Sequence, residues 1–353
     1  MDVMEIVHEG EEVRGDAATA LLDVQNLRTY FFTRQGVVKA VDGVSFSLRP
    51  AETLAIVGES GCGKSITALS LMRLVPDPPG RIVEGSMRLG DLDLLALDED
   101  AMRNVRGKDI SMIFQEPMTS LNPVMTIGRQ ISEVLLLHED VGRDAAWQKA
   151  TEMLRIVRIP EPEQRMKEYP HQLSGGMRQR AMIAMALACN PQVLIADEPT
   201  TALDVTIQAQ ILEIIVDLQR KLGTAVILIT HDLGVVAETA QRVIVMYAGR
   251  KVEEASVADL FARPQHPYTH GLLASIPRLG LMRGEEERTA ERLQEIPGIV
   301  PALTHLPEGC AFAPRCAFAE DQCRRAYPPY EEKQPAHWAA CWRSQALYGG
   351  GDA

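Results

Sequence analysis

The sequence predicts an α/β protein built around a mostly parallel sheet, and two kinds of observation lead to this fold class. Short, continuously apolar runs such as TLAIV (53–57), VLIA (193–196) and AVILI (225–229) are typical of strands that are buried on both faces. Stretches with helical spacing lie between such runs, so strands alternate with helices along the chain. A glycine-rich turn, GESGCGKS (58–65), follows the first of these runs directly and precedes a helical pattern.

The expected elements follow in chain order. Residues 21–57 contain three strand-like runs separated by turns, and helical spacing dominates from about residue 126 to residue 190. The strand QVLIAD (192–197) precedes a helix that Gly223 ends, with one face formed by Ile207, Ile211, Ile214, Leu218 and Leu222. AVILIT is another buried strand, and VIVMYAGRKVEE predicts a hairpin that turns at Ala248-Gly249.

Composition excludes several classes of protein. The chain has 353 residues, 46% of them hydrophobic, which is enough for a sizeable core, and its net charge of −12 argues against nucleic-acid binding. The acidic segment 1–20 does not resemble a signal peptide, and the apolar runs are shorter than the roughly 20 residues that cross a bilayer. We therefore expect a soluble, cytoplasmic protein that reaches a membrane through partner subunits. Beyond a charged helix or linker, GEEERTAERLQE (284–295), the composition shifts, which indicates a domain boundary near residues 260–300.

The glycine-rich turn has the pattern of a phosphate-binding loop, Gly58-x4-Gly63-Lys64-Ser65. Its glycines let backbone N–H groups converge on phosphates at the N-terminus of the next helix. Lys64 is expected to reach the β- and γ-phosphates, and the Ser65 hydroxyl to bind Mg²⁺. The loop residues expected to contact nucleotide are Gly58, Glu59, Ser60, Gly61, Cys62, Gly63, Lys64 and Ser65. The alternative is a chance match, which the strand before the loop and the helix after it disfavour.

Two adjacent acids end a later strand, and they fit the chemistry of the same site. Asp197 is placed to hold Mg²⁺ through water, and Glu198 to activate the attacking water. Adjacent acids at a strand end often form a solvated turn only. The phosphate loop upstream favours the catalytic interpretation.

A third motif, LSGGMRQR (173–180), identifies a family. The sequence resembles that of ATP-binding cassette (ABC) proteins, whose signature is LSGGQ, with Met177 in place of the glutamine. Ser174, Gly175 and Gly176 are present, and the serine can also act as an ordinary N-cap of the following helix. In the family this motif completes the ATP site of the opposite subunit, so that two cassettes enclose two nucleotides. The resemblance implies a cassette over residues 21–260 with a RecA-like core, an antiparallel β subdomain and a helical signature subdomain.

The remaining positions of the family pattern are also present. Gln115 matches the loop glutamine near Mg²⁺ and the attacking water, Asp204 matches the D-loop aspartate near the dimer seam, and His231 matches the switch histidine that contacts the γ-phosphate. Phe31 best fits the aromatic residue that stacks on adenine, although Tyr30, Phe32 or a packing role for all three are alternatives. A minor departure is Ala51-Glu52 in place of the usual Gly-Glu turn.

Among cassette proteins, a transporter subunit fits best. The chain has one phosphate loop, unlike two-cassette translation factors, and the 110 positions between residues 64 and 174 leave no room for the long coiled coil of a repair ATPase. The segment HPYTHGLLASIP, which begins at His266, resembles the tail of dipeptide and oligopeptide importer ATPases. That resemblance implies an assembly with two permease subunits, a second ATPase and an external solute-binding protein. It places this chain at the cytoplasmic face of the inner membrane. Importers of nickel and other small solutes share this tail and remain an alternative, as does an ABC ATPase outside transport.

The last segment, 261–353, contains four of the six cysteines: Cys310, Cys316, Cys323 and Cys341. Four thiolates can hold either Zn²⁺ or an iron–sulfur cluster, and thiols without a ligand are the remaining alternative. No two of them lie two to four residues apart, as in structural zinc sites, and the resemblance to peptide importers favours a [4Fe–4S] cluster over zinc. Cys62 is a separate case: its place near a helix N-terminus predicts a reactive thiolate, the alternative being an inert residue at a variable position.

Overall fold

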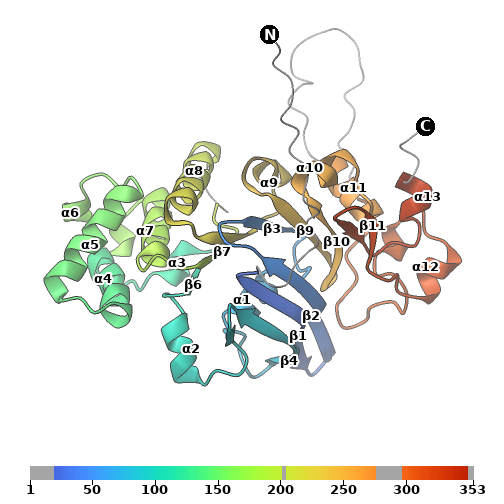
Figure 1. Cartoon of the computed structure of the whole chain (residues 1–353), viewed down its shortest axis with the longest axis horizontal. Helices are drawn as coiled ribbons and strands as arrows, with labels where there is room; N and C mark the ends of the chain where they lie inside the picture. Colours follow the sequence, from blue (N-terminus) through green and yellow to red (C-terminus); the bar gives the residue numbers. More distant parts are fainter. Residues whose placement is uncertain (1–19, 201–203, 276–295, 349–353) are drawn as a thin grey trace, which may run out of the picture.

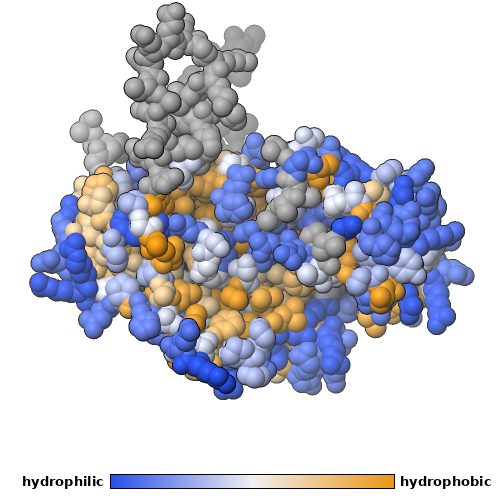
Figure 2. Space-filling model, turned by 180° about the vertical axis from the view of Figure 1, so that it is seen from behind, coloured by the Kyte–Doolittle hydropathy of each residue, from blue (hydrophilic) through white to orange (hydrophobic). Residues whose placement is uncertain are grey.

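The computed structural model describes residues 20–200, 204–275 and 296–348. Within these residues the chain forms two β-sheets, and helices cover both faces of the larger one (Figure 1). Figure 2 shows the molecule from behind, with hydrophilic residues at its two ends and hydrophobic ones gathered across the middle. Segment 284–295, residues 1–19 of the acidic N-terminal segment and Thr201 to Leu203, which directly precede the D-loop aspartate Asp204, lie outside the described residues.

The larger sheet has eight strands within the described chain, in the order β11-β12-β10-β9-β3-β8-β7-β6. Strands β9, β3, β8, β7 and β6 are parallel, whereas β10, β12 and β11 continue the sheet in antiparallel fashion. Their bounds are β3 (Thr53–Val57), β6 (Ile110–Ile113), β7 (Val193–Asp197), β8 (Ala225–Ile229), β9 (Arg242–Tyr247), β10 (Arg250–Ser256), β11 (Glu331–Gln334) and β12 (His337–Ala339). The prediction of a mostly parallel α/β sheet is confirmed.

The parallel strands are mostly apolar because both of their faces are buried. On β7, Val193 and Ile195 join the core that contains α1 (Lys64–Leu71), whereas Leu194 and Ala196 join the core that contains α8 (Val205–Leu222). Successive side chains of a strand point to opposite faces, so neither face shows the polar alternation of a half-exposed strand.

The smaller sheet is antiparallel and covers the α1 side of the larger one. Its order is β2-β1-β4-β5. The strands are β1 (Leu22–Thr33), β2 (Gly36–Leu48), β4 (Gly80–Leu89) and β5 (Leu92–Asp93), and helix α2 (Glu99–Val105) follows them. Thr29 of β1 and Ser70 of α1 are hydrogen-bonded through their hydroxyls at 2.7 Å, which ties this sheet to the helix after the phosphate loop.

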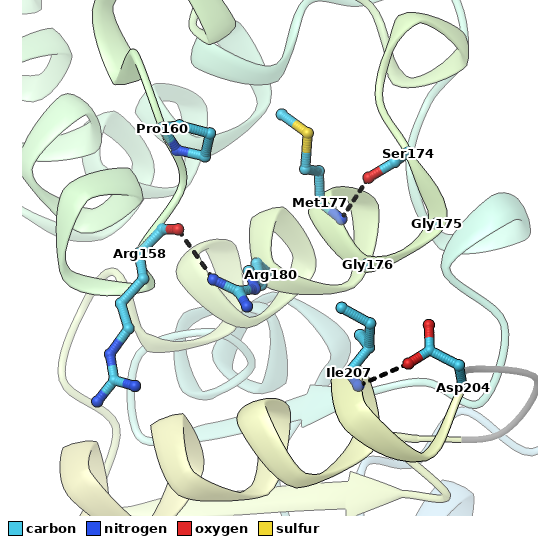
Figure 3. Close-up of a pocket in the computed structure, with 9 residues that line it drawn as sticks. All are labelled: Arg158, Pro160, Ser174, Gly175, Gly176, Met177, Arg180, Asp204 and Ile207. Carbon is cyan, nitrogen blue, oxygen red and sulfur yellow. Dashed lines mark hydrogen bonds between the residues drawn. The ribbon is translucent and has the colours of Figure 1, made fainter.

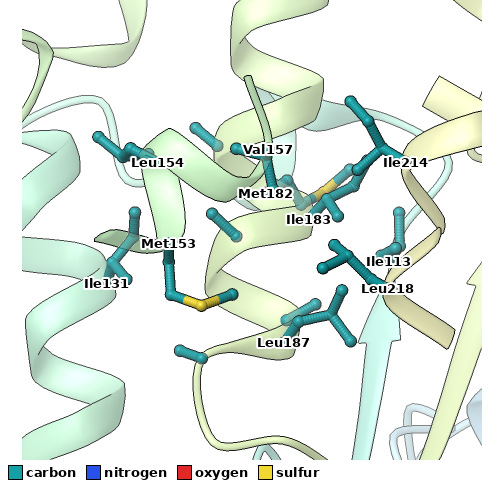
Figure 4. Close-up of a cluster of buried hydrophobic side chains, with 14 of the residues drawn as sticks. Ile113, Ile131, Met153, Leu154, Val157, Met182, Ile183, Leu187, Ile214 and Leu218 are labelled. Atoms are coloured by element: carbon teal, nitrogen blue, oxygen red, sulfur yellow. The ribbon is translucent and has the colours of Figure 1, made fainter. Parts of the chain in front are cut away.

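A helical region projects from the carboxyl end of β6, at the left of Figure 1. Its elements are α3 (Pro117–Ser120), α4 (Ile127–His138), α5 (Arg143–Ile156), α6 (Pro162–Arg165), the 3-10 turn η2 (Pro170–Gln172) and α7 (Gly175–Leu187). Helices α4, α5 and α7 pack around buried aliphatic side chains, which also contact α8 (Figure 4). The helical spacing read from residues 126 to 190 is therefore confirmed.

The predictions for the second half of the cassette also agree with the structure. Helix α8 ends at Leu222, and Gly223 caps it with a φ of 71°. Strands β9 and β10 form the predicted hairpin, and its two turn residues, Ala248 and Gly249, have φ values of 48° and 81°, as a two-residue hairpin turn requires. The remaining helices near this edge are α9 (Leu233–Thr239), α10 (Val257–Ala262) and α11 (Pro267–Ala274).

The C-terminal segment, residues 261–353, continues the larger sheet, which the sequence did not predict. Strand β12 pairs with β10, and β11 pairs with β12. The other elements here are η4 (Ala313–Arg315), α12 (Asp321–Arg325) and α13 (Ser344–Tyr348). The fully buried Glu253 carboxylate accepts hydrogen bonds from the backbone N–H groups of Gln265 and His266 and lies 2.7 Å from His337 Nε2, so a polar network joins this segment to β10.

Candidate functional site

The glycine-rich loop lies between β3 and α1, as predicted. Gly58, Gly61 and Gly63 have φ values of 150°, 78° and 105°, which L-residues rarely adopt. The Lys64 side chain is buried and donates hydrogen bonds to the carbonyl oxygens of Gly58 at 2.8 Å and Glu59 at 3.1 Å. The same Nζ atom makes a third, longer contact with Cys62 Sγ at 3.9 Å, so the loop itself orients all three of its N–H donors.

The back of this loop is packed against the protein. A Cβ atom at Gly63 would overlap the carbonyl oxygen of Ala40 on β2, and one at Gly58 would overlap that of Met246 on β9. The backbone N–H groups of Ser60, Gly61 and Gly63 have no acceptor among the described residues. These donors, together with the N-terminus of α1, form a typical anion site.

Polar side chains from the carboxyl ends of three neighbouring strands meet beside the loop. Ser65 Oγ donates to Asp197 Oδ1 at 3.1 Å, at the end of β7. Gln115, which follows β6, donates to Glu198 Oε2 at 3.0 Å. His231, which follows β8, has its Nδ1 atom 3.5 Å from Glu198 Oε1. The structure therefore brings together Ser65, Gln115, Asp197, Glu198 and His231, all of them predicted from the sequence.

The two acids of this group lie in different environments. Asp197 is 4% exposed, and burial raises the pKa of its carboxyl, an effect that the hydrogen bond from Ser65 opposes. Glu198 has a φ of 45°, a conformation that is uncommon for residues other than glycine. Strained backbone of this kind often occurs where a side chain must be held in one direction for chemistry.

The signature segment borders a pocket of about 520 Å³, shown in Figure 3. Ser174 is the N-cap of α7 and accepts from the Met177 N–H at 3.3 Å, so the alternative role as N-cap is confirmed. Asp204 caps α8 at the same pocket and accepts from the Ile207 N–H at 2.9 Å. Two helix N-termini thus face one opening, and no residue of the phosphate loop lines it.

Sequence reasoning missed two basic residues of the signature pocket, Arg158 and Arg180. Arg180 donates to the carbonyl oxygen of Arg158 at 2.9 Å, and burial together with the positive charge of Arg158 lowers the pKa of Arg180. Arg180 follows Met177 by three residues, so helical spacing contained a signal for it. Arg158 lies on another segment, and nothing in the sequence placed it here.

The three aromatic candidates for adenine stacking differ in their surroundings. Tyr30 Oη donates to Asp42 at 2.7 Å, and Phe31 lies against Gly80 of β4, where an added Cβ would lie 2.8 Å from the ring. Phe32 is 52% exposed. Adenine stacking by Phe31 remains a prediction, and Phe32 is its most exposed alternative.

The prediction of a reactive thiolate at Cys62 is wrong. The side chain is fully buried, and this burial raises the pKa of the thiol despite the nearby Lys64 ammonium. Desolvation of a thiolate outweighs the attraction of the positive helix end, because the charge is removed from water. The alternative of an inert residue agrees with the structure.

The four C-terminal cysteines border a single small cavity. Burial raises the pKa of Cys310 and of Cys341 to about 11 each, and the charges of the other thiols in the group add to the rise. No group of three or more His, Cys, Asp or Glu side chains in the described part of the chain has the arrangement expected for a bound metal ion. The cluster and zinc interpretations therefore remain predictions.

Two family models match the chain. Residues 41–201 match the family described as "ABC transporter", and residues 252–323 match "Oligopeptide/dipeptide transporter, C-terminal region". A probable peptide ABC transporter ATP-binding protein of Sinorhizobium fredii is 60% identical over 330 residues, covering 94% of this chain and 97% of the relative. An oligopeptide transport ATP-binding protein of Bacillus subtilis is 57% identical over 305 residues, covering 86% and 91%.

Solved structures give the same result for the fold. A dimeric ATP-binding cassette in a post-hydrolysis state, bound to ADP and Pi, has a TM-score of 0.61 and 26% identity and covers 67% of this chain and 98% of that chain. Within the described residues, no helix is both long and apolar enough to cross a bilayer.

Proposed function

The chain belongs to the family of peptide ABC transporter ATP-binding proteins, and we propose that it is the ATP-hydrolysing subunit that drives a membrane importer of di- or oligopeptides. The observation that carries this proposal is similarity along nearly the whole chain: relatives named for peptide transport are 53% to 60% identical to it over 86% to 94% of its length. The match at residues 252–323 adds a region named for oligopeptide and dipeptide transporters.

Within this function, the loop Gly58–Ser65 binds the phosphates of ATP, and Ser65, Gln115 and Asp197 hold the Mg²⁺ that accompanies it. The contacts of Ser65 with Asp197 at 3.1 Å and of Gln115 with Glu198 at 3.0 Å support this assignment. Glu198 accepts a proton from the attacking water, and His231, 3.5 Å from it, orients the carboxylate and contacts the γ-phosphate.

The signature residues act on the nucleotide of a second ATPase subunit. The separation of the signature pocket from the phosphate loop supports this, because Ser174, Gly175, Gly176 and Asp204 line a pocket that no loop residue borders. A second cassette, either identical or a sister chain, supplies the phosphate loop that faces this signature pocket. Two permease subunits hold the pair of cassettes at the cytoplasmic face of the membrane. An external solute-binding protein delivers the peptide.

Substitution of the proposed general base tests the chemistry. Glu198→Gln keeps the shape of the side chain and loses the ability to accept a proton, so ATP turnover should fall by about 10²- to 10⁴-fold while ATP binding is retained. Glu238→Gln, an exposed glutamate on α9, is the matched control and should turn over normally. Near-normal turnover by Glu198→Gln in the assembled transporter would remove Glu198 from this role.

Co-purification and uptake test the transport function. Tagged protein isolated from solubilised membranes should carry two permease subunits and a second ATPase. Cells that depend on the transporter should accumulate labelled di- and oligopeptides, and loss of uptake should follow Lys64→Ala. Uptake of nickel with no uptake of peptides would contradict the proposed substrate and leave the ATPase chemistry intact.

Residues 261–353 form, in this proposal, a small Cys-rich extension of the cassette (21–260) in which Cys310, Cys316, Cys323 and Cys341 hold a [4Fe–4S] cluster. Support comes from the small cavity that all four thiols border. A bound cluster would cross-link a segment with few periodic apolar residues. Anaerobically purified protein should be brown and contain about four irons per chain. Colourless protein with stoichiometric zinc would exclude the cluster.

A further inference from the structure

Two side chains of the C-terminal segment contact one residue of the phosphate loop, Glu59. The Arg315 guanidinium donates to both carboxylate oxygens of Glu59, at 2.6 Å and 3.0 Å. The Tyr268 hydroxyl oxygen accepts a hydrogen bond from the backbone N–H of Glu59 at 2.8 Å. Tyr268 lies on α11 and Arg315 ends η4, so two separate elements of this segment converge on one loop residue.

Arg315 is itself held firmly. Its side chain is 4% exposed, its Nε donates to the carbonyl oxygen of Pro297 at 2.9 Å, and its charged group lies 5.9 Å from the ring centres of Tyr247 and Phe312. Tyr268 packs against the same two rings, at 4.7 Å and 5.4 Å between centroids. A buried, bidentate arginine of this kind fixes both the position and the direction of its carboxylate partner.

The contact continues from Glu59 to the lysine of the loop. The Glu59 carbonyl oxygen accepts a hydrogen bond from Lys64 Nζ at 3.1 Å. Glu59 is therefore fixed through its N–H by Tyr268, through its carboxylate by Arg315 and through its carbonyl by Lys64. None of these three contacts uses the N–H groups of Ser60, Gly61 and Gly63, which have no acceptor among the described residues. The contacts that fix Glu59 therefore do not compete with a phosphate for these donors.

We propose that Arg315 and Tyr268 are positioning residues through which the C-terminal segment holds the phosphate loop in its nucleotide-binding shape. They act through Glu59 and do not touch the nucleotide themselves. This inference rests on the proposed function, since it takes ATP as the ligand of the loop. If it is correct, the C-terminal segment increases the affinity of the phosphate loop for ATP.

The test is a titration of the purified full-length chain with a fluorescent ATP analogue, for the wild type and for Arg315→Gln, Glu59→Gln, the double variant and Tyr268→Phe. Each single substitution should weaken binding by roughly three- to tenfold. This is the range for a charge-assisted contact with a partly exposed carboxylate, as between Arg315 and Glu59, and for a neutral hydrogen bond, as between the Glu59 N–H and Tyr268. The Arg315→Gln/Glu59→Gln double variant should bind no more weakly than the weaker-binding of its two single variants, because both substitutions break the same contact. In the assembled transporter, the KM for ATP should rise with kcat unchanged.

Arg324→Gln is the matched control, since this arginine lies in the same segment and pairs with Asp321 of its own helix, α12. It should bind the analogue as the wild type does. Lower melting temperatures with unchanged affinity in all the single variants would show a purely structural role and overturn the inference. Tyr268→Phe keeps the packed ring and Glu59→Gln changes a partly exposed group, so both remain informative if Arg315→Gln does not fold. If the wild type itself does not bind the analogue, the proposed function fails and the inference fails with it.

Discussion

Gly63 and Gly61 differ sharply in what an added methyl group would meet, which predicts very different costs for Gly63→Ala and Gly61→Ala. At Gly63, which is the N-cap of α1, the φ is 105° and a Cβ would overlap the Ala40 carbonyl oxygen. At Gly61 the φ is 78° and an added Cβ would have no other atom within 4 Å. The unfavourable backbone conformation lowers the unfolding free energy of both variants, whereas steric overlap lowers that of Gly63→Ala alone.

The magnitudes follow from these two contributions. An L-residue in a left-handed conformation costs about 1–2 kcal/mol, which is the full expected loss of unfolding free energy for Gly61→Ala. Overlap with a backbone atom that cannot swing away adds roughly 1–3 kcal/mol, as overpacking in a core does. Gly63→Ala should therefore lose about 2–5 kcal/mol.

Urea unfolding of the full-length chain, followed by circular dichroism, measures both losses, with Gly142→Ala as the control because Gly142 has an ordinary negative φ and open space around it. The control should remain within about 0.5 kcal/mol of the wild type. Equal losses for Gly61→Ala and Gly63→Ala would refute the argument that packing against β2 fixes the back of the loop.

Two further predictions concern buried groups. Cys62 should react with iodoacetamide far more slowly in the native chain than in urea, and MgATP should add little protection, because the thiol is fully buried with a raised pKa; rapid native labelling would contradict this. His266 is fully buried, its Nδ1 accepts from the Tyr268 N–H, and burial lowers its pKa from 6.5 to about 3. The unfolded chain therefore binds a proton that the folded chain does not, so this group's contribution to stability is complete above pH 6.5 and is lost at about 1.4 kcal/mol per pH unit as the pH falls toward 3. His266→Asn keeps a side-chain acceptor without a titrating group, so its unfolding free energy should depend less on pH between 6.5 and about 4.5; identical pH dependence in both proteins would exclude His266 as the source.

Some features could be predicted from the sequence because their causes are local. The phosphate loop requires glycines, a lysine and a serine at fixed spacing, so Gly58 to Ser65 could be assigned without a structure. The hairpin turn at Gly249 and the end of α8 at Gly223 depend on glycines, which accept a positive φ without steric cost. The apolar composition of β3, β7 and β8 follows from burial on both faces, which a single run of residues reveals.

Other features were decided by the folded chain alone. Cys62 lies near a helix N-terminus in the sequence, but the surrounding core removes it from water and reverses the predicted shift of its pKa. Strands β11 and β12 are short and partly polar, and they form because the edge of β10 offers unpaired hydrogen-bonding groups.

The contact between Arg315 and Glu59 joins residues 256 positions apart, and no motif links them. Sequence patterns reveal local properties of the chain, namely backbone freedom, hydrophobic periodicity and helix capping. Burial, desolvation and the pairing of distant charges depend on which surfaces meet. In this protein the cassette core around α1 buries Cys62, and the packing of residues 261–353 against the cassette pairs Arg315 with Glu59.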